Sequence, residues 1–194
     1  MSENSSLKNI LEAILFAANK TLNLEALFNL LLEDLEVSRA DIKAALNELM
    51  SDYQPKAINL VELASGYRFQ TKAEYSKWVN LLWEEKPQKY SRALLETLAL
   101  IAYRQPITRG DIEEVRGVAV SSNIMKTLQE RNWVKVVGHR DVPGRPAMYA
   151  TSKQFLDYFN LKSLEQLPSL AEIRDIDLIS KEVSAQLELM EESD

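Results

Sequence analysis

The spacing of apolar residues switches from a helical to an alternating period twice along this chain, in the same order each time. In residues 1–85, three segments carry apolar residues at helical intervals, and two alternating runs follow at 58–62 and 67–71, separated by Ser65 and Gly66. Apolar residues three and four apart line one face of a helix, whereas alternation lines one face of a strand. This part is therefore predicted to form three helices and a hairpin, with a further helix over residues 74–84.

Residues 86–165 repeat that order. Three helical segments are predicted, and the first ends near Gln105 because the residue before a proline disfavours helical backbone. Alternating apolar runs then flank a turn at 142–145, and a closing helix follows. Two copies of helix, helix, helix, hairpin and helix predict a mainly helical α+β fold of tandem winged-helix domains. The expected domains are 1–85 and 86–165, joined through the polar stretch 85–89.

Charge is distributed unevenly along the 194 residues. The net charge is −6, but residues 86–160 hold 12 Lys and Arg against 7 Asp and Glu, while residues 161–194 hold 3 against 9. A local positive field attracts nucleic acid or acidic protein segments, although a surplus of this size also fits ordinary solvated surfaces. We expect residues 166–194 to form a flexible acidic tail.

Residue types that build active sites are scarce. His139 is the one histidine, Cys is absent, and the five glycines form neither the P-loop nor the dinucleotide-binding pattern. Acidic pairs such as Glu113 and Glu114 lie on predicted helices without a neighbouring base. We therefore expect no enzyme activity, no cofactor and no metal site. The lack of Cys and of a long apolar run also favours a cytoplasmic location.

The turn at 142–145 has a local cause. Pro143 presets φ and Gly144 supplies the positive φ that a type II turn requires at its third position. Pro146 would start the return strand where no amide donor is needed. The basic-type side chains expected to project from this wing are His139, Arg140 and Arg145.

Three uses of this basic wing remain open. It could bind DNA, with Asn123, Lys126 and Gln129 of the preceding helix in the major groove. It could instead bind another protein, or it could simply turn the chain. Acidic residues on that helix and on its counterpart in the first unit would repel phosphate: Glu130, Asp41, Glu48 and Asp52.

The predicted helix at 74–84 carries more apolar surface than one small core uses. Trp78, Leu82 and Trp83 lie on more than one of its faces. Surplus apolar surface is typical of a partner interface, or the second unit could cover it within the chain. The three residues are our candidates for dimerisation through the first unit.

Five short runs of sequence carry a family resemblance. They are LETLALIAYRQPITR at 95–109, DIEEVRGV at 111–118, GRPAMYAT at 144–151, FLDYFNL at 155–161 and, more loosely, GYRFQT at 66–71. Together they closely resemble segregation and condensation protein B, the ScpB family. The resemblance implies a tandem winged-helix subunit of the bacterial SMC condensin that dimerises through its N-terminal domains, binds the kleisin ScpA and has no catalytic activity of its own.

The resemblance also implies where the kleisin would bind. Arginine suits such sites because its planar guanidinium grips carboxylates and carbonyl oxygens in a fixed geometry. The candidate partner-binding residues are Arg109, Arg116, Arg145 and Tyr149, with Pro143, Gly144 and Pro146 shaping the wing. The SMC ATPase would be reached through ScpA at the nucleoid, and any DNA contact would be indirect or weak. The alternative is a winged-helix regulator of transcription that binds DNA.

Overall fold

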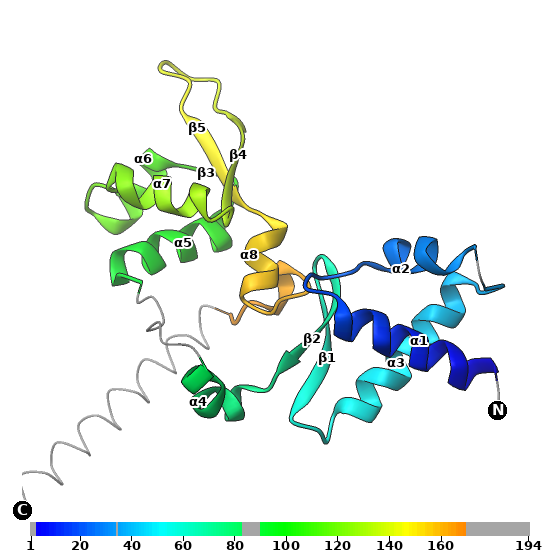
Figure 1. Ribbon diagram of the computed structural model, residues 1–194. Helices are drawn as coiled ribbons and strands as arrows, with labels where there is room; N and C mark the ends of the chain where they lie inside the picture. The colour runs from blue at the N-terminus through cyan, green and yellow to red at the C-terminus, as the bar shows by residue number, and fades with distance from the viewer. Residues whose placement is uncertain (1–2, 34, 83–89, 170–194) are drawn as a thin grey trace, which may run out of the picture. The chain divides into compact units, whose positions relative to one another are not determined.

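The computed structural model describes residues 3–33, 35–82 and 90–169 of the chain (Figure 1). Met1–Lys162 forms one compact body. Ser163–Asp194 forms a separate body, whose described part contains one short 3-10 helix, Leu164–Gln166. Trp83, the expected linker at 85–89 and the expected acidic tail from residue 170 onward lie outside the described residues.

Three helices open the chain, and the second and third begin where local capping chemistry predicts. They are α1 (Glu3–Ala17), α2 (Leu24–Leu31) and α3 (Arg39–Tyr53). The side chain of Asn23 accepts a hydrogen bond from the Ala26 amide at 2.7 Å and so caps α2. Ser38 and Asp41 form a reciprocal capping box at the start of α3, with Asp in the position that Glu usually takes.

A hairpin follows α3 and is tied back to the helices by a third backbone segment. Strands β1 (Ile58–Leu63) and β2 (Gly66–Thr71) pair antiparallel, as predicted, and the turn falls at Ala64 and Ser65, one residue earlier than expected. On the other side of β2, the Leu22 amide donates to the Tyr67 carbonyl at 3.0 Å and the Tyr67 amide donates to the Leu22 carbonyl at 2.8 Å. The loop between α1 and α2 therefore acts as a one-residue strand that holds β2 in place.

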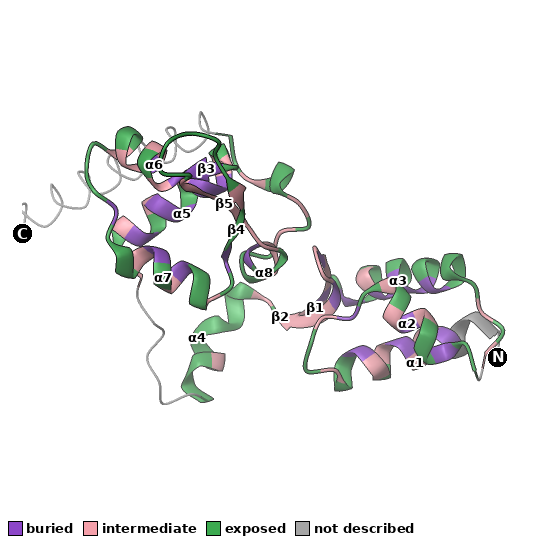
Figure 2. Ribbon diagram, turned by 90° about the horizontal axis from the view of Figure 1, so that it is seen from above, coloured by how far each residue is buried: buried purple, intermediate pink, exposed green. Residues whose placement is uncertain are grey.

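The core of this first winged-helix unit is made by the inner faces of α1, α2 and α3 together with the hairpin. Its most deeply buried members come from all three helices, and the purple faces in Figure 2 turn toward one another. Burying side chains of this kind contributes about 1.5–3 kcal/mol each to folding. They are Leu11, Leu15, Leu27, Ile42, Leu46 and Leu49.

The second winged-helix unit repeats the arrangement. Its elements are α5 (Arg92–Arg104), β3 (Ile107–Thr108), α6 (Arg109–Arg116), α7 (Ser122–Glu130), β4 (Val134–His139), β5 (Ala147–Thr151) and α8 (Lys153–Tyr158). The sheet order is β3-β5-β4, and Ile107 pairs with Tyr149 just as Leu22 pairs with Tyr67. Both units thus have the three helices and the antiparallel sheet of a winged helix, which confirms the α+β fold expected from the repeated pattern.

Aromatic packing closes the second unit. Trp133 is almost completely buried, and its ring centroid lies 4.5 Å from that of Tyr158 and 5.5 Å from that of Phe159. The ring of Tyr90, the first described residue after the gap, lies 5.2 Å from Trp133 on another side. This cluster fixes α8 against the end of α7.

One predicted helix is not continuous. In place of a single helix at 74–84, the described residues form three successive turns: η1 (Ala73–Tyr75), α4 (Ser76–Val79) and η2 (Asn80–Leu82). The helical spacing of the apolar residues predicted one continuous helix, which the structure does not have. Most of these side chains pack against no core, so they supply little of the tertiary stabilisation that a regular helix needs.

Gly66 is required by the close approach of the loop between α1 and α2. Its φ is +133°, and a Cβ at this position would lie 2.6 Å from the Asn23 Cα and closer still to the Leu22 carbonyl oxygen. We expect Gly66→Ala to lower the free energy of unfolding by about 2–4 kcal/mol through strain and loss of the Leu22–Tyr67 pairing. Urea denaturation of both proteins measures this difference.

The matched control is Gly110→Ala. Gly110 lies in the first turn of α6, and a Cβ there would meet nothing closer than the Thr108 hydroxyl at 3.8 Å. The control is expected to be neutral or slightly stabilising. A Gly66→Ala variant as stable as the control would show that the loop between α1 and α2 can shift at little cost.

Candidate interaction surfaces

The wing of the second unit turns where the sequence predicts. The Arg145 amide donates to the Val142 carbonyl at 2.9 Å, and Gly144 has a φ of +86°. The Pro146 carbonyl accepts a hydrogen bond from the Arg140 amide at 2.9 Å. Proline has no backbone N–H, so it pairs at the base of the wing through its carbonyl alone. Arg145 is exposed at the tip, while Tyr149 is half-buried between Ile107 and Val136 in the sheet.

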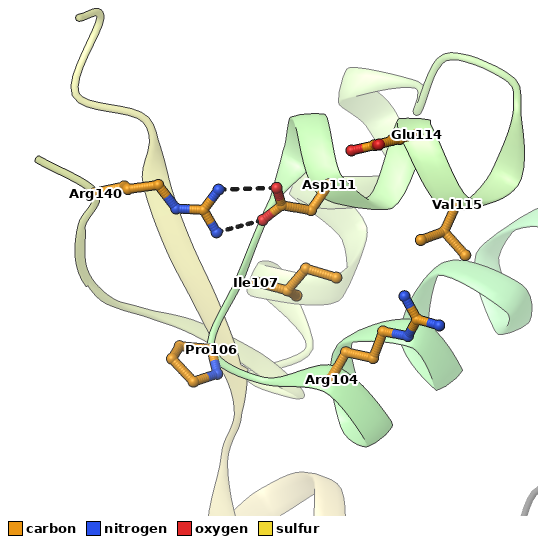
Figure 3. A pocket seen from close by; sticks show the side chains of 7 residues that line it. All are labelled: Arg104, Pro106, Ile107, Asp111, Glu114, Val115 and Arg140. Carbon is orange, nitrogen blue, oxygen red and sulfur yellow. Dashed lines mark hydrogen bonds and ion pairs between the residues drawn. The ribbon is translucent and has the colours of Figure 1, made fainter. Parts of the chain in front are cut away.

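Arg140 does not project freely from the wing as we expected. Its guanidinium donates to both carboxylate oxygens of Asp111, at 2.9 and 2.6 Å, and thereby joins the wing to the start of α6 (Figure 3). Asp111 also accepts from the Thr108 amide at 2.9 Å as part of the capping box that begins this helix. The sequence indicates the capping role of Asp111, but the pairing with Arg140 depends on how the wing folds back.

These bonds change the acidity of Asp111. The hydrogen bonds from Arg140, followed by those from Thr108, hold the pKa of the Asp111 carboxyl well below its ordinary value of 3.8. Both members of the pair are partly exposed, so the interaction fixes geometry more than it adds stability.

A shallow groove of about 560 Å³ lies beside this pair. Its floor includes Ile107 and Pro106, and Arg104 approaches from the side opposite Arg140 (Figure 3). Val115 and Glu114 of α6 form the remaining wall. The groove therefore combines a small apolar floor with four charged side chains around its rim.

Two of the arginines predicted to hold a partner are engaged within the chain. Arg109 donates to Glu113 at 3.0 Å, to Ser122 at 3.2 Å and to the Val120 carbonyl, bonds that hold the loop between α6 and α7. Arg116 has a side chain only 11% exposed and donates to Glu96 at 3.1 Å and to Thr97 at 3.3 Å. Their contact with a partner stays a prediction, and Arg145 is the candidate most open to solvent.

The segment from η1 to η2 exposes four large apolar side chains. We call these residues the α4 patch: Tyr75, Trp78, Leu81 and Leu82, with exposed fractions of 38%, 60%, 80% and 77%. The helical turns that carry them are largely green in Figure 2. The described residues of the second unit do not cover the patch, so the exposed surface expected from the sequence is present at Trp78 and Leu82, and Trp83 lies outside the described residues.

The helix that would read DNA is only weakly cationic. Asn123, Lys126 and Gln129 are exposed on α7, as predicted, but the Lys126 ammonium lies 3.6 Å from the Glu130 carboxylate. Arg140 is likewise neutralised by Asp111. Phosphate binding depends on uncompensated cations, and these two pairs remove part of that charge.

Among the described residues, no group of three His, Asp or Glu side chains is placed to hold a metal ion. In the same part of the chain, no helix is both long enough and apolar enough to cross a bilayer.

These features define a tandem winged-helix protein whose surfaces suit binding to other polypeptides. Residues 9–170 match the family model described as segregation and condensation complex subunit ScpB. A protein of Coxiella burnetii named segregation and condensation protein B homolog is 55% identical over 185 residues, covering 95% of this chain and 88% of that protein. The chain belongs to the ScpB family.

One further relative and two solved structures are also similar to this chain. Segregation and condensation protein B of Syntrophotalea carbinolica is 44% identical over 172 residues, covering 88% of this chain and 85% of that protein. The solved ScpB of Mycobacterium tuberculosis is 32% identical, covers 83% of this chain and 99% of its own, and superposes with a TM-score of 0.38. A solved dimer of an ScpB N-terminal domain complexed with an ScpA peptide is 33% identical, covers 42% of this chain and 99% of its own, and has a TM-score of 0.38.

The Arg140–Asp111 pair predicts a specific dependence of stability on pH. A carboxyl whose pKa is lower in the folded than in the unfolded state stabilises the fold above its unfolded pKa, about 3.9, and this stabilisation is lost as the pH falls through that value and below. Arg140→Gln should bring the pKa of Asp111 back toward its ordinary value. The variant is therefore expected to lose less stability than the unmodified chain between pH 6 and pH 3.

Thermal melts across that pH range measure the effect. Arg104→Gln is the control, because Arg104 lines the same groove from the opposite side. Its pH profile should match that of the unmodified chain. Identical profiles for Arg140→Gln and the unmodified chain would contradict the assigned pairing.

Proposed function

We propose that this chain is a non-enzymatic adaptor subunit of a bacterial SMC condensin, acting in chromosome condensation and segregation. In this role it forms a homodimer, binds the kleisin ScpA and reaches the SMC ATPase through ScpA, in the cytoplasm and at the nucleoid. Membership of the ScpB family supports the assignment, and the ScpA peptide bound to another ScpB N-terminal domain names the partner to test. The observation that carries the proposal is the exposed α4 patch.

Dimerisation is assigned to residues 1–85 through the α4 patch. An aromatic ring and two leucines that remain more than half exposed in one chain are costly to leave in water, at about 25 cal/mol per Å² of apolar surface. A second copy of the chain can cover the same patch by a two-fold axis, since such an interface is self-complementary. Trp78 and Leu82, with Trp83 beside them in sequence, are the proposed contacts.

Kleisin binding is assigned to residues 86–165. Arg145 is exposed at the tip of the wing, and Tyr149 is half-buried in the strand that leads away from it. Arg109 and Arg116 hold the loop after α6 and the contact between α6 and α5, so they would support the binding surface even where they do not touch the partner. Residues 166–194 would remain a tail outside both interfaces.

Removing the α4 patch should separate the dimer. The change is Trp78→Ser with Leu82→Ser, and we expect the dissociation constant of the dimer to rise roughly 30-fold or more, because buried aromatic anchors dominate interface energies. Sedimentation equilibrium at micromolar concentration measures the mass. Leu30→Ser, which alters an exposed leucine on α2, is the control and should leave the dimer intact. An unmodified chain that sediments as a monomer would refute the assignment.

The wing arginine should contribute to binding of ScpA. We expect Arg145→Ala to weaken the complex with the cognate ScpA subunit about fivefold or more, because an interface arginine at the centre of a contact typically contributes upward of about 1 kcal/mol. Titration calorimetry gives the affinity. Arg92→Ala is the control, since this side chain is 93% exposed on α5. Separate elution of the unmodified chain and ScpA from a sizing column would exclude the proposed partner.

A further inference from the structure

Two of the runs that carry the family resemblance meet in space. The turn of the first hairpin, directly before the GYRFQT run, contacts the end of α8, which belongs to the FLDYFNL run. One carboxylate oxygen of Asp157 accepts from the Ser65 amide at 3.0 Å, and the other accepts from the Ser65 hydroxyl. These residues lie 92 positions apart in the sequence, one in each winged-helix unit.

Arg68 makes the reciprocal contact. Its guanidinium donates to the Asp157 backbone carbonyl at 3.2 Å and to the Asn160 side chain at 3.1 Å. Asn160 follows the C-cap of α8 and has a φ of +58°, and the Leu161 amide then closes back onto the Leu156 carbonyl at 2.7 Å. The last carbonyls of a helix attract cations and need donors, so Arg68 acts as a cap supplied by the other unit.

Two further bonds flank this contact. The Ala64 amide donates to the Leu161 carbonyl at 3.2 Å, and the Lys162 ammonium donates to the Glu62 carboxylate at 2.7 Å. Hairpin turns ordinarily lie in solvent. Here Ala64 and Ser65 are only partly exposed, and Leu63 just before them is 4% exposed.

We propose that Ser65, Arg68, Asp157 and Asn160 form an interdomain clasp that holds the two winged-helix units in one fixed arrangement. The Asp157 carboxylate of the second unit accepts hydrogen bonds from the Ser65 amide and hydroxyl in the turn of the first unit. The Arg68 guanidinium of the first unit donates to a backbone carbonyl at the end of α8 in the second. Neither unit can make these bonds alone. The four residues of the clasp are polar and lie outside the core of the first unit, so the clasp can open without unfolding that core.

The clasp itself does not depend on ScpA or on the dimer, whereas its use in spacing two binding surfaces rests on the proposed function. A protein that binds several partners at two units needs a set distance between those surfaces, because the second contact then forms without a search. Arg68 and Asp157 are therefore positioning residues, which set the spacing of binding surfaces that they do not themselves touch.

The test is a distance distribution in the isolated protein. The chain contains no cysteine, so Asn47→Cys on α3 and Gln129→Cys on α7, both exposed, place one spin label in each unit. Labelled protein diluted into an excess of unlabelled protein reports distances within one chain only. Double electron–electron resonance should give a single narrow distribution, and Arg68→Ala or Asp157→Ala should at least double its width.

The control is Arg39→Ala, which removes an exposed guanidinium bonded to both oxygens of Glu25 within the first unit. It should leave the distribution narrow. Ser65→Ala keeps the hairpin and removes one bond to Asp157, so it provides a milder variant whose fold is easily checked by circular dichroism. A broad distribution in the clasped chain, or variants as narrow as the control, would overturn the inference. Either result would leave dimerisation and ScpA binding untouched.

Discussion

The fold depends on a backbone contact repeated once in each half of the chain. A residue in the loop between the first and second helices pairs with the last strand of the hairpin: Leu22 with Tyr67 in the first unit, and Ile107 with Tyr149 in the second. In both units the next residue along the chain caps the second helix through its side chain. One short segment thus sets the position of the sheet and the start of a helix together. In the first unit the loop between α1 and α2 approaches β2 so closely that only a glycine fits at position 66.

A basic wing suggests cations that are free to bind phosphate, but in the second unit several of these cations pair within the chain. Arg140 is bonded to the start of α6, Arg109 to the loop that follows α6, and Arg116 to α5. A winged helix with three arginines paired within the chain offers fewer free cations to a phosphate backbone, and the affinity for DNA rises with each free cation. The α4 patch, in contrast, exposes large apolar side chains, and such surface is typical of proteins that bind other polypeptides.

The sequence predicted those parts of the fold that short-range chemistry decides. Helix starts at Asn23 and Ser38 follow from side chains that reach an amide three residues away, and the wing turn follows from the backbone preference of Gly144. The missed parts depend on residues far apart. Ser65 and Asp157 each look ordinary in their own segments, and their bond exists only because two folded units bring them together. Periodicity alone also failed at residues 74–84, where apolar spacing without a core to pack against gave short turns in place of a helix.

The two hairpins differ in what surrounds their tips, and this has a consequence for how each can vary. The tip of the first is enclosed, with Leu63 buried beside it, whereas the tip of the second, from Asp141 to Arg145, lies in solvent. Exposed tips accept inserted residues because the added chain can extend into solvent, whereas an enclosed tip has no space for it. Lengthening the second ribbon should thus be tolerated across related chains, while the first must keep its two-residue bend.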